Sequence, residues 1–330
     1  MKCAVVGAGA WGTALANVLA SNGHAVSLWA RESDVVEAIN GKRENLRFLP
    51  GVCLEEAIRA TGIMAEALGG AELVTYVAPS HALREVVASG AAAVRPDAVL
   101  VVASKGIERE SLAIMSDVVG DTLPRHAVVA LSGPSFAAEV ARGQPTAVVA
   151  ASANEAAATA VQRALSSDAF RVYTHDDVIG VELGGALKNV MAVATGITEG
   201  VGLGFNSRAA LITRGLAEMT RLGIALGASQ ATFAGLAGLG DLVLTCTGAL
   251  SRNRALGIEI GKGSTLEQAL EGKDTVAEGV LNTISARALA EREGVDMPIV
   301  LGVHRILFEA QPPRLAISEL MSRELRAEQD

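Results

Sequence analysis

The feature that most constrains this chain is a glycine pattern at its N-terminus. The run Lys2–Val6 leads into Gly7, Gly9 and Gly12, and an alanine-rich stretch follows. In this spacing the first glycine allows a tight turn, the second lets the backbone approach a pyrophosphate, and the third lets a helix pack closely on the strand. The helix N-terminus offers N–H groups to the anion. The pattern therefore predicts a strand, turn and helix that bind a dinucleotide.

The residues after the second predicted strand, 25–29, bear on which dinucleotide is bound. At this place an acidic residue binds the ribose hydroxyls of NAD, whereas an arginine accommodates the 2′-phosphate of NADP. The chain has Arg31 followed by Glu32. Arg31 favours binding of NADPH, and Glu32 keeps NADH as the alternative cofactor. The alternative is that Arg31 is a solvated residue that opens a helix.

Apolar runs alternate with helical patterns through the first half of the chain. Such strands, separated by helices, indicate a parallel sheet that is covered on both faces. The predicted strands are 2–6, 25–29, 72–78, 98–103, 127–131, 146–150 and 170–173. From residue 177 the pattern is helical. We therefore expect an α/β protein: a Rossmann-type, doubly wound, mostly parallel sheet domain over residues 1–176, and an all-α substrate domain over residues 177–330.

Composition excludes several classes of function. The formal net charge is −8 and only 3% of the residues are aromatic, whereas nucleic-acid binding needs a basic face and often stacking rings. Charges or glycines interrupt the apolar runs, so we expect no insertion into a membrane. Cys3, Cys53 and Cys246 have neither disulfide nor metal-ligand spacing. We expect a cytoplasmic enzyme without a metal; the oligomeric state stays open, with a homodimer as one option.

Polar residues follow two of the predicted strands, at the edge where ligands bind in open α/β sheets. Lys105 comes after one strand, and the segment Ser132–Ala137 after the next. Lys105 stands where a cation meets a bound anion. The stretch from Gly133 to Ser135 resembles a helix N-cap that presents N–H groups. The alternatives are a solvated lysine and an ordinary cap.

A lysine marks the first long helical pattern of the second half. Lys188 follows Gly184 and Gly185 by one helical turn, so it shares a face with residues that lack side chains, and a ligand can approach the backbone there. A lysine on an apolar helix is costly to bury without a role. The alternative is a side chain that reaches solvent.

Two later segments carry further polar residues. Asp241 lies in a glycine-rich, apolar stretch, and Ser251, Arg252 and Asn253 precede an apolar periodic run. Ser251 and Asn253 are residue types that cap helices, and Arg252 can bind a phosphate through two hydrogen bonds. Cap, helix dipole and guanidinium would then converge on one anion. The alternative is an ordinary capped helix with solvated arginines.

Taken in order, six motifs resemble those of bacterial NAD(P)-dependent glycerol-3-phosphate dehydrogenases. They are Gly7–Ala16, Ser104–Gly106, Ser132–Ala137, Gly185–Asn189, Gly240–Leu242 and Ser251–Asn253. Together they span nearly the whole chain and are specific. The resemblance implies a reversible NAD(P)H-dependent reduction of dihydroxyacetone phosphate to sn-glycerol 3-phosphate, the backbone precursor of membrane phospholipids.

The resemblance also implies a role for individual residues. Lys188 would be the catalytic residue that transfers the proton. The small-molecule substrate would be held by Lys105, Gly133, Ser135, Lys188, Asp241, Ser251, Arg252 and Asn253, with Asn189 and Thr245 as additions. The cofactor would contact Ala10, Trp11, Arg31, Lys105, Ala137, Arg252, Val276 and Glu278, in addition to Gly7, Gly9 and Gly12 of the glycine pattern. Family members differ at position 31, so the preference for NADPH over NADH rests on Arg31 itself.

The chemistry of these residue types agrees with the reaction. Hydride arriving at a ketone carbon leaves an alkoxide, which needs a proton donor and positive charge nearby, and Lys188 can supply both. Lys105 would make its ammonium more acidic and Asp241 would oppose this, so the protonation state stays open. Two alternatives remain: a related two-domain reductase of another small anionic ketone, and a non-catalytic NADPH-sensing regulator. A regulator would not need Lys188, Asp241 and Arg252 together.

Overall fold

The computed structural model describes residues 1–272, 278–325 and 327–328. It divides into two compact units: a sheet unit of residues 1–185 and 228–241, and a helical unit of residues 186–227 and 242–330. Helix α8 (Val178–Gly200) begins in the first unit and ends in the second. The domain boundary between residues 176 and 177 stays a prediction.

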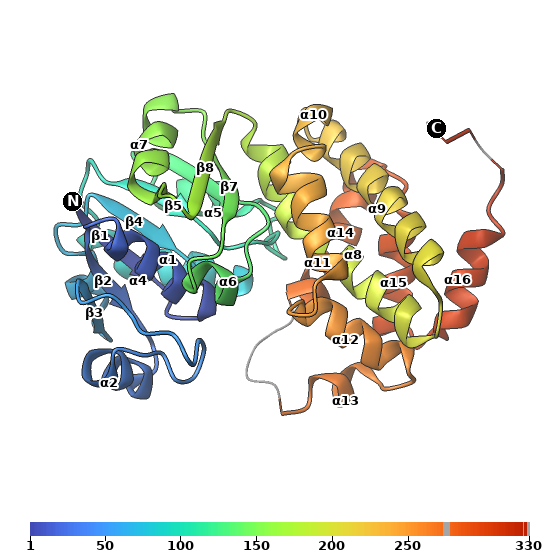
Figure 1. Cartoon of the computed structure of the whole chain (residues 1–330). Coiled ribbons are helices and arrows are strands. Elements are labelled where there is room, and N and C mark those ends of the chain that lie inside the picture. The colour runs from blue at the N-terminus through green and yellow to red at the C-terminus, as the bar shows by residue number, and fades with distance from the viewer. Residues whose placement is uncertain (273–277, 326, 329–330) are drawn as a thin grey trace. The chain divides into compact units, whose positions relative to one another are not determined.

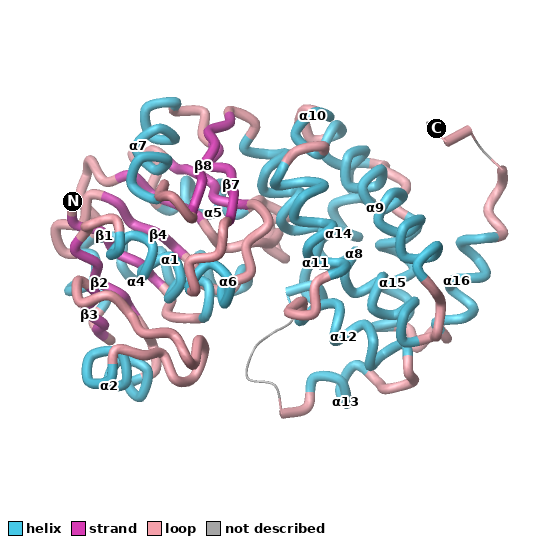
Figure 2. Tube along the Cα trace, in the orientation of Figure 1, coloured by secondary structure: helices cyan, strands magenta, loops and turns pink. Residues whose placement is uncertain are grey.

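Among the described residues, eight strands form one sheet in the order β3-β2-β1-β4-β5-β6-β7-β8 (Figures 1 and 2). All neighbouring strands are parallel except β6 and β7. The strand order reverses between β1 and β4, which is the switch point of a doubly wound fold. The predicted fold class is confirmed. The strands are β1 (Lys2–Val6), β2 (Ala25–Trp29), β3 (Ile58–Thr61), β4 (Leu73–Tyr76), β5 (Val99–Val102), β6 (Val128–Ser132), β7 (Thr146–Ala151) and β8 (Phe170–His175).

Side chains of successive strand residues fill two cores, one on each face of the sheet. In β1, Cys3 and Val5 belong to the core that α1, α2 and α7 cover, whereas Ala4 and Val6 belong to the core under α3, α4 and α5. Burial on both faces is why the strands read as continuous apolar runs. The helices are α1 (Ala10–Ser21), α2 (Ser33–Lys42), α3 (Met64–Leu68), α4 (Leu83–Gly90), α5 (Met115–Thr122), α6 (Ala137–Ala141) and α7 (Glu155–Leu165), with short turns η1 (Ser80–Ala82) and η2 (Ala91–Ala93).

The described part of the chain after residue 177 contains helices only, as the sequence predicts. Helix α8 is long and apolar enough to cross a membrane, but 89% of its most apolar window is buried inside the protein, as in a core helix. Helices α9, α14 and α15 pack against one another. The remaining elements are α9 (Phe205–Ala225), α10 (Gln230–Phe233), the π-helical turn η3 (Leu236–Gly240), α11 (Asp241–Thr247), α12 (Arg252–Gly261), α13 (Leu266–Leu270), α14 (Glu278–Glu293), α15 (Pro298–Phe308) and α16 (Pro313–Met321).

Candidate active site

The glycine turn between β1 and α1 has the backbone geometry that its spacing predicts. Gly7 has φ of 120°, and a Cβ on it would lie 2.8 Å from the carbonyl oxygen of Val77. A Cβ on Gly12 would lie 1.8 Å from the oxygen of Gly7, so only glycine allows the helix to pack this closely. Beside Gly9, the N-cap of α1, a Cβ would meet no atom within 4 Å. The backbone there is open to a ligand, and Ala10 and Trp11 follow it at the start of the helix.

A buried amide that the sequence analysis missed holds this turn in place. Asn45 Nδ2 donates to the oxygen of Ala8 and to Thr13 Oγ1, both at 2.8 Å, and Asn45 is fully buried. Its Oδ1 accepts from the N–H of Phe48 at 3.0 Å. The asparagine lies in the loop after α2, outside any periodic run, so no pattern pointed to it.

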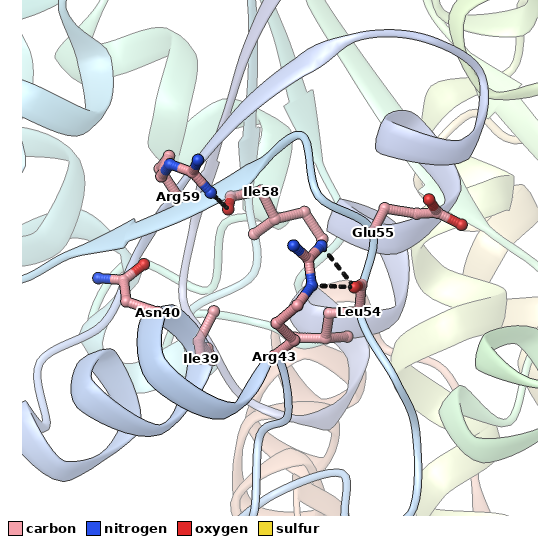
Figure 3. A pocket seen from close by; sticks show the side chains of 7 residues that line it. All are labelled: Ile39, Asn40, Arg43, Leu54, Glu55, Ile58 and Arg59. Atoms are coloured by element: carbon pink, nitrogen blue, oxygen red, sulfur yellow. Dashed lines mark hydrogen bonds between the residues drawn. The ribbon is translucent and has the colours of Figure 1, made fainter.

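The loop that carries Asn45 is closed by an arginine. Arg43 adopts φ of 57° at the end of α2, and its Nε and Nη2 donate to the oxygen of Leu54 at 3.0 and 2.8 Å (Figure 3). Arg59 Nη1 donates to the oxygen of Ile58 at 3.2 Å in the same surface pocket. Both guanidinium groups bind backbone carbonyls. We therefore interpret this pocket as part of the loop's structure and not as a ligand site.

Arg31 and Glu32, the residues on which the predicted cofactor preference rests, pair with each other. Arg31 Nη2 lies 3.0 Å from Glu32 Oε1, and 84% of the Arg31 side chain is exposed. Glu32 occupies the N-cap position of α2, but its side chain makes no cap hydrogen bond. The arginine is therefore accessible to a ligand, with its charge partly balanced by its neighbour.

A buried ion pair joins two residues of the predicted substrate site within the sheet unit. Lys105 Nζ lies 2.6 Å from Asp241 Oδ2 and donates to the oxygen of Gly133 at 3.2 Å. Asp241 is fully buried and 17% of the Lys105 side chain is exposed. Away from water, each charge is strongly stabilised by the other. The fold thus brings together Lys105, Gly133 and Asp241, which lie far apart in the sequence.

The segment after β6 departs from one prediction. Ser135 Oγ donates to the oxygen of Gly133 at 3.0 Å, and α6 begins after Phe136, whose side chain makes no cap hydrogen bond. The prediction that Gly133–Ser135 form a helix N-cap is therefore wrong, because the serine hydroxyl turns back to the preceding carbonyl. Gly133 has φ of 140°, a left-handed conformation that favours glycine. Ala137 is the first residue of α6.

The expected open backbone beside Lys188 is also corrected. A Cβ on Gly184 would lie 2.5 Å from the oxygen of Ala237, and one on Gly185 would lie 2.7 Å from Ser132 Oγ. Protein atoms fill the space that these glycines leave, so they serve close packing of α8.

Lys188 itself is held inside the helical unit. Its Nζ donates to Thr245 Oγ1 at 2.9 Å, and only 8% of the residue is exposed. The predicted alternative, a side chain that reaches solvent, is therefore wrong. A buried lysine side chain with a positioned hydroxyl beside it is suited to proton transfer.

The start of α12 gathers the other predicted residues of this unit. Ser251 caps the helix, since its Oγ accepts from the N–H of Arg254 at 3.2 Å, and the exposed Arg252 follows it. Asn253 is not a cap. Its Nδ2 donates to Asn189 Oδ1 at 2.9 Å, and its Oδ1 accepts from the N–H of Gly279 at 3.0 Å.

Glu278 and Val276 are the remaining residues that the sequence predicts to contact the cofactor. Glu278 is the first residue of α14, directly before Gly279, whereas Val276 lies outside the described residues. In the described part of the chain, no group of three or more His, Cys, Asp or Glu side chains could hold a metal ion.

Family models and related sequences match this chain over most of its length. Residues 2–158 match the family model of the NAD-dependent glycerol-3-phosphate dehydrogenase N-terminus, and residues 177–318 match that of the C-terminus. A glycerol-3-phosphate dehydrogenase [NAD(P)+] of Trichlorobacter lovleyi is 56% identical over 333 residues, covering 100% of both chains. The chain belongs to the NAD-dependent glycerol-3-phosphate dehydrogenase family. The family assignment made from the six motifs is confirmed.

Other members and solved structures agree with this glycerol-3-phosphate dehydrogenase assignment. The Geobacter sulfurreducens enzyme is 54% identical, over 99% of this chain and 98% of its own length. The crystal structure of glycerol-3-phosphate dehydrogenase from Coxiella burnetii superposes with a TM-score of 0.94 at 42% identity, covering 98% of this chain and 99% of that one. A ketopantoate reductase from Ralstonia eutropha, at 18% identity and a TM-score of 0.62, shares the fold alone.

Proposed function

We propose that this chain reversibly reduces dihydroxyacetone phosphate to sn-glycerol 3-phosphate with NADPH or NADH, and so supplies the backbone of glycerophospholipids. The observation that carries the proposal is Lys188, a buried lysine whose Nζ donates to Thr245 Oγ1 at 2.9 Å in a member of this dehydrogenase family. A ketone reductase needs such a proton donor beside the developing alkoxide.

The chemistry divides between the cofactor and the chain. NAD(P)H supplies the hydride when it is bound. Lys188 gives the alkoxide its proton, and Thr245 fixes the direction of the ammonium. Asp241 and the oxygen of Gly133 hold Lys105 in place as a hydrogen-bond donor for an anionic substrate, and Asp241 balances its charge.

The phosphate of the substrate is proposed to bind at the N-terminus of α12. Ser251 caps this helix and Arg252 is exposed on its first turn, so the helix dipole and a guanidinium fork are available to one anion. Asn253, Asn189, Gly133 and Ser135 complete the proposed substrate residues.

The cofactor site is proposed around the glycine turn. The open backbone at Gly9 fits a pyrophosphate, since no atom would meet a Cβ there within 4 Å. The contacts proposed from the family resemblance are Gly7, Gly9, Ala10, Trp11, Gly12, Arg31, Lys105, Ala137, Arg252, Val276 and Glu278. The exposed guanidinium of Arg31 supports a preference for NADPH.

A cytoplasmic location is a further part of the proposal, and a homodimer is one option for the oligomeric state. The three cysteines are free thiols, as expected of a protein in a reducing compartment. Size-exclusion chromatography with light scattering measures the oligomeric state directly.

NADPH oxidation in the presence of dihydroxyacetone phosphate tests the reaction. We expect turnover with this ketone and very poor turnover with unphosphorylated dihydroxyacetone, because binding energy from the remote phosphate lowers the barrier at the reacting carbon. In the same assay, Lys188→Ala should lose most turnover but keep NADPH binding. Equal rates with both ketones contradict the proposed substrate, and preserved turnover in Lys188→Ala contradicts the role of the lysine.

A further inference from the structure

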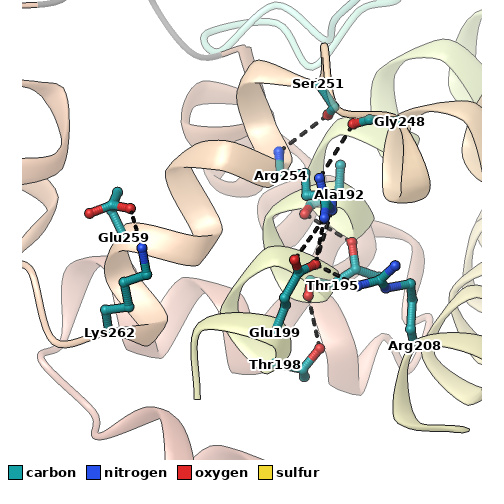
Figure 4. Close-up of polar contacts among 10 residues, drawn as sticks. All are labelled: Ala192, Thr195, Thr198, Glu199, Arg208, Gly248, Ser251, Arg254, Glu259 and Lys262. Atoms are coloured by element: carbon teal, nitrogen blue, oxygen red, sulfur yellow. Dashed lines mark hydrogen bonds and ion pairs between the residues drawn. The ribbon is translucent and has the colours of Figure 1, made fainter. Parts of the chain in front are cut away.

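An ion pair ties the first turn of α12 to α8 (Figure 4). Arg254 Nη2 lies 2.7 Å from both carboxylate oxygens of Glu199, and its Nε lies 3.1 Å from Oε2. The side chains are 15% and 30% exposed. A fork of this kind fixes the direction of both side chains, unlike a single contact between solvated charges.

The same arginine contacts the segment that precedes α12. Its Nη1 donates to the oxygen of Gly248 at 3.5 Å, and its backbone N–H donates to Ser251 Oγ at 3.2 Å. One residue therefore holds α8, the capping serine and the turn before the helix. Arg252, the proposed phosphate ligand, lies between Ser251 and Arg254 in the sequence.

Glycines bring the backbones of the two helices into contact beside this pair. A Cβ on Gly196 of α8 would lie 2.1 Å from the oxygen of Arg254, and one on Gly257 of α12 would lie 2.2 Å from the oxygen of Val193. One turn further along, Gly200 and Gly261 meet in the same way. The separation of the helices is thus set by backbone contact, and their register at the first turn of α12 by the ion pair.

We propose that Glu199 and Arg254 are positioning residues, which aim Ser251 and Arg252 at the phosphate of the substrate. The inference rests on the function proposed above. Because its guanidinium is directed at Glu199 and at the oxygen of Gly248, Arg254 acts through its neighbours. Glu199 follows Lys188 by 11 residues of α8, about 16 Å along the helix, so the pair does not act on the reacting carbon.

The test compares Arg254→Ala, Arg254→Lys and Glu199→Gln with the unchanged enzyme. We expect Arg254→Ala to lower kcat/KM for dihydroxyacetone phosphate by roughly 10-fold or more, mainly through KM, and to change kcat/KM for dihydroxyacetone by less than about 2-fold. Inorganic phosphate should become a correspondingly weaker competitive inhibitor. Arg254→Lys should recover only part of the loss, because an ammonium keeps the charge without the fork.

Arg208 provides the matched control. Its Nη2 lies 2.6 Å from the same oxygen, Glu199 Oε2, but it comes from α9. Arg208→Lys should leave two quantities unchanged: the ratio of the kcat/KM values for the two ketones, and the inhibition by inorganic phosphate. Thermal unfolding of each variant checks folding, and Glu199→Gln provides a second, nearly isosteric route if Arg254→Ala does not fold.

The outcomes separate this inference from the proposed function. If the unchanged enzyme fails to reduce dihydroxyacetone phosphate, the proposed function is wrong. If it does reduce this ketone, and the variants lose efficiency equally for both ketones or change only in thermal stability, the pair is a structural link and the inference is overturned. The same conclusion follows if Arg208→Lys has the same effect as Arg254→Lys.

Discussion

Lys105 and Asp241 illustrate how burial couples two residues of the candidate site. Asp241 is fully buried and its Oδ2 lies 2.6 Å from Lys105 Nζ. Removing the lysine leaves a carboxylate in a place that water does not reach, which is far costlier than losing a surface pair. Loss of activity in a Lys105 variant would therefore combine loss of the proposed substrate contact with a displaced Asp241. Kinetics of such a variant need a parallel measurement of stability.

The proposed preference for NADPH depends on a single exposed side chain, that of Arg31. Arg31→Ala should raise KM for NADPH by about 10-fold and leave KM for NADH nearly unchanged, because only NADPH carries the 2′-phosphate. A hydrogen bond to a charged group contributes about 1.5–3 kcal/mol, and the 84% exposure of Arg31 places the effect at the lower end. Steady-state kinetics with both cofactors measures it.

Glu32 gives the complementary variant for this prediction. Glu32→Gln removes the carboxylate that pairs with Arg31 at 3.0 Å, so NADPH should bind more tightly and NADH less tightly. If Arg31→Ala weakens both cofactors alike, Arg31 does not read the 2′-phosphate.

Single residues show where sequence reasoning succeeds and where it stops. Ser251 is a helix cap as predicted, because a serine directly before an apolar periodic run has few other local partners. Ser135 has the same residue type, but its hydroxyl binds the Gly133 carbonyl. Asn45 supports the glycine turn from 37 residues away, and no local pattern records such a contact. The type of a residue indicates which interactions its side chain can make, whereas the fold determines which hydrogen-bond partners it finds.

At the scale of elements, the sequence predicts seven of the eight described strands, including the edge strand β8, but not β3 at the opposite edge. β3 was missed because its sequence is short and Arg59 is exposed, so the run lacks the apolar signal of a buried strand. The reversed direction of β7 was also missed. An apolar run reads alike in either direction, and the side chains of a strand buried on both faces do not record which way the chain runs.

Two helix glycines should respond in opposite ways to the same substitution. A Cβ on Gly302, in the middle of α15, would meet only Leu320 Cδ1 at 4.0 Å and would fill part of an apolar pocket. Gly302→Ala should therefore stabilise the protein by about 1 kcal/mol, through higher helix propensity. We expect the midpoint of thermal unfolding to rise by about 2 °C.

Gly257 is the matched control for packing. It also lies inside a helix, α12, but its Cβ would fall 2.2 Å from the oxygen of Val193. Gly257→Ala should lower stability by roughly 1–3 kcal/mol despite the same gain in propensity, because the backbones must separate. A higher unfolding midpoint for Gly257→Ala, or a lower one for Gly302→Ala, contradicts this account.

At the scale of the whole molecule, each unit buries a carboxylate at the start of a helix. In the sheet unit, Glu182 accepts from the N–H of Ser116 in α5 at 3.1 Å. In the helical unit, Glu218 accepts from the N–H of Ile299 in α15 at 2.8 Å. Burial raises the pKa of both carboxyl groups to about 7. The hydrogen bonds from the helix oppose this shift, but desolvation is the larger effect.

These two carboxyl groups make the stability of both units depend on pH in the same direction. The ordinary pKa of the Glu218 carboxyl is 4.5, so below that value it is protonated in the folded and the unfolded chain. Between pH 4.5 and about 7, the folded chain keeps a proton that the unfolded chain has released. The free energy of unfolding therefore falls as the pH rises through this window.

Replacing one of the two carboxyl groups isolates its share of this pH dependence. Glu218→Gln removes the ionisable group. Raising the pH from 4.5 to 7.5 should therefore lower the free energy of unfolding less in the variant than in the unchanged protein. The difference between the two decreases should be on the order of 3 kcal/mol. Thermal unfolding at a series of pH values measures the gap between the two proteins. Glu267→Gln, in an exposed position of α13, should follow the unchanged protein throughout. Because Glu182 remains, part of the pH dependence should persist in Glu218→Gln and decrease further in the double variant. A gap that stays constant with pH would mean that Glu218 titrates alike in the folded and the unfolded chain, so that burial does not raise its pKa.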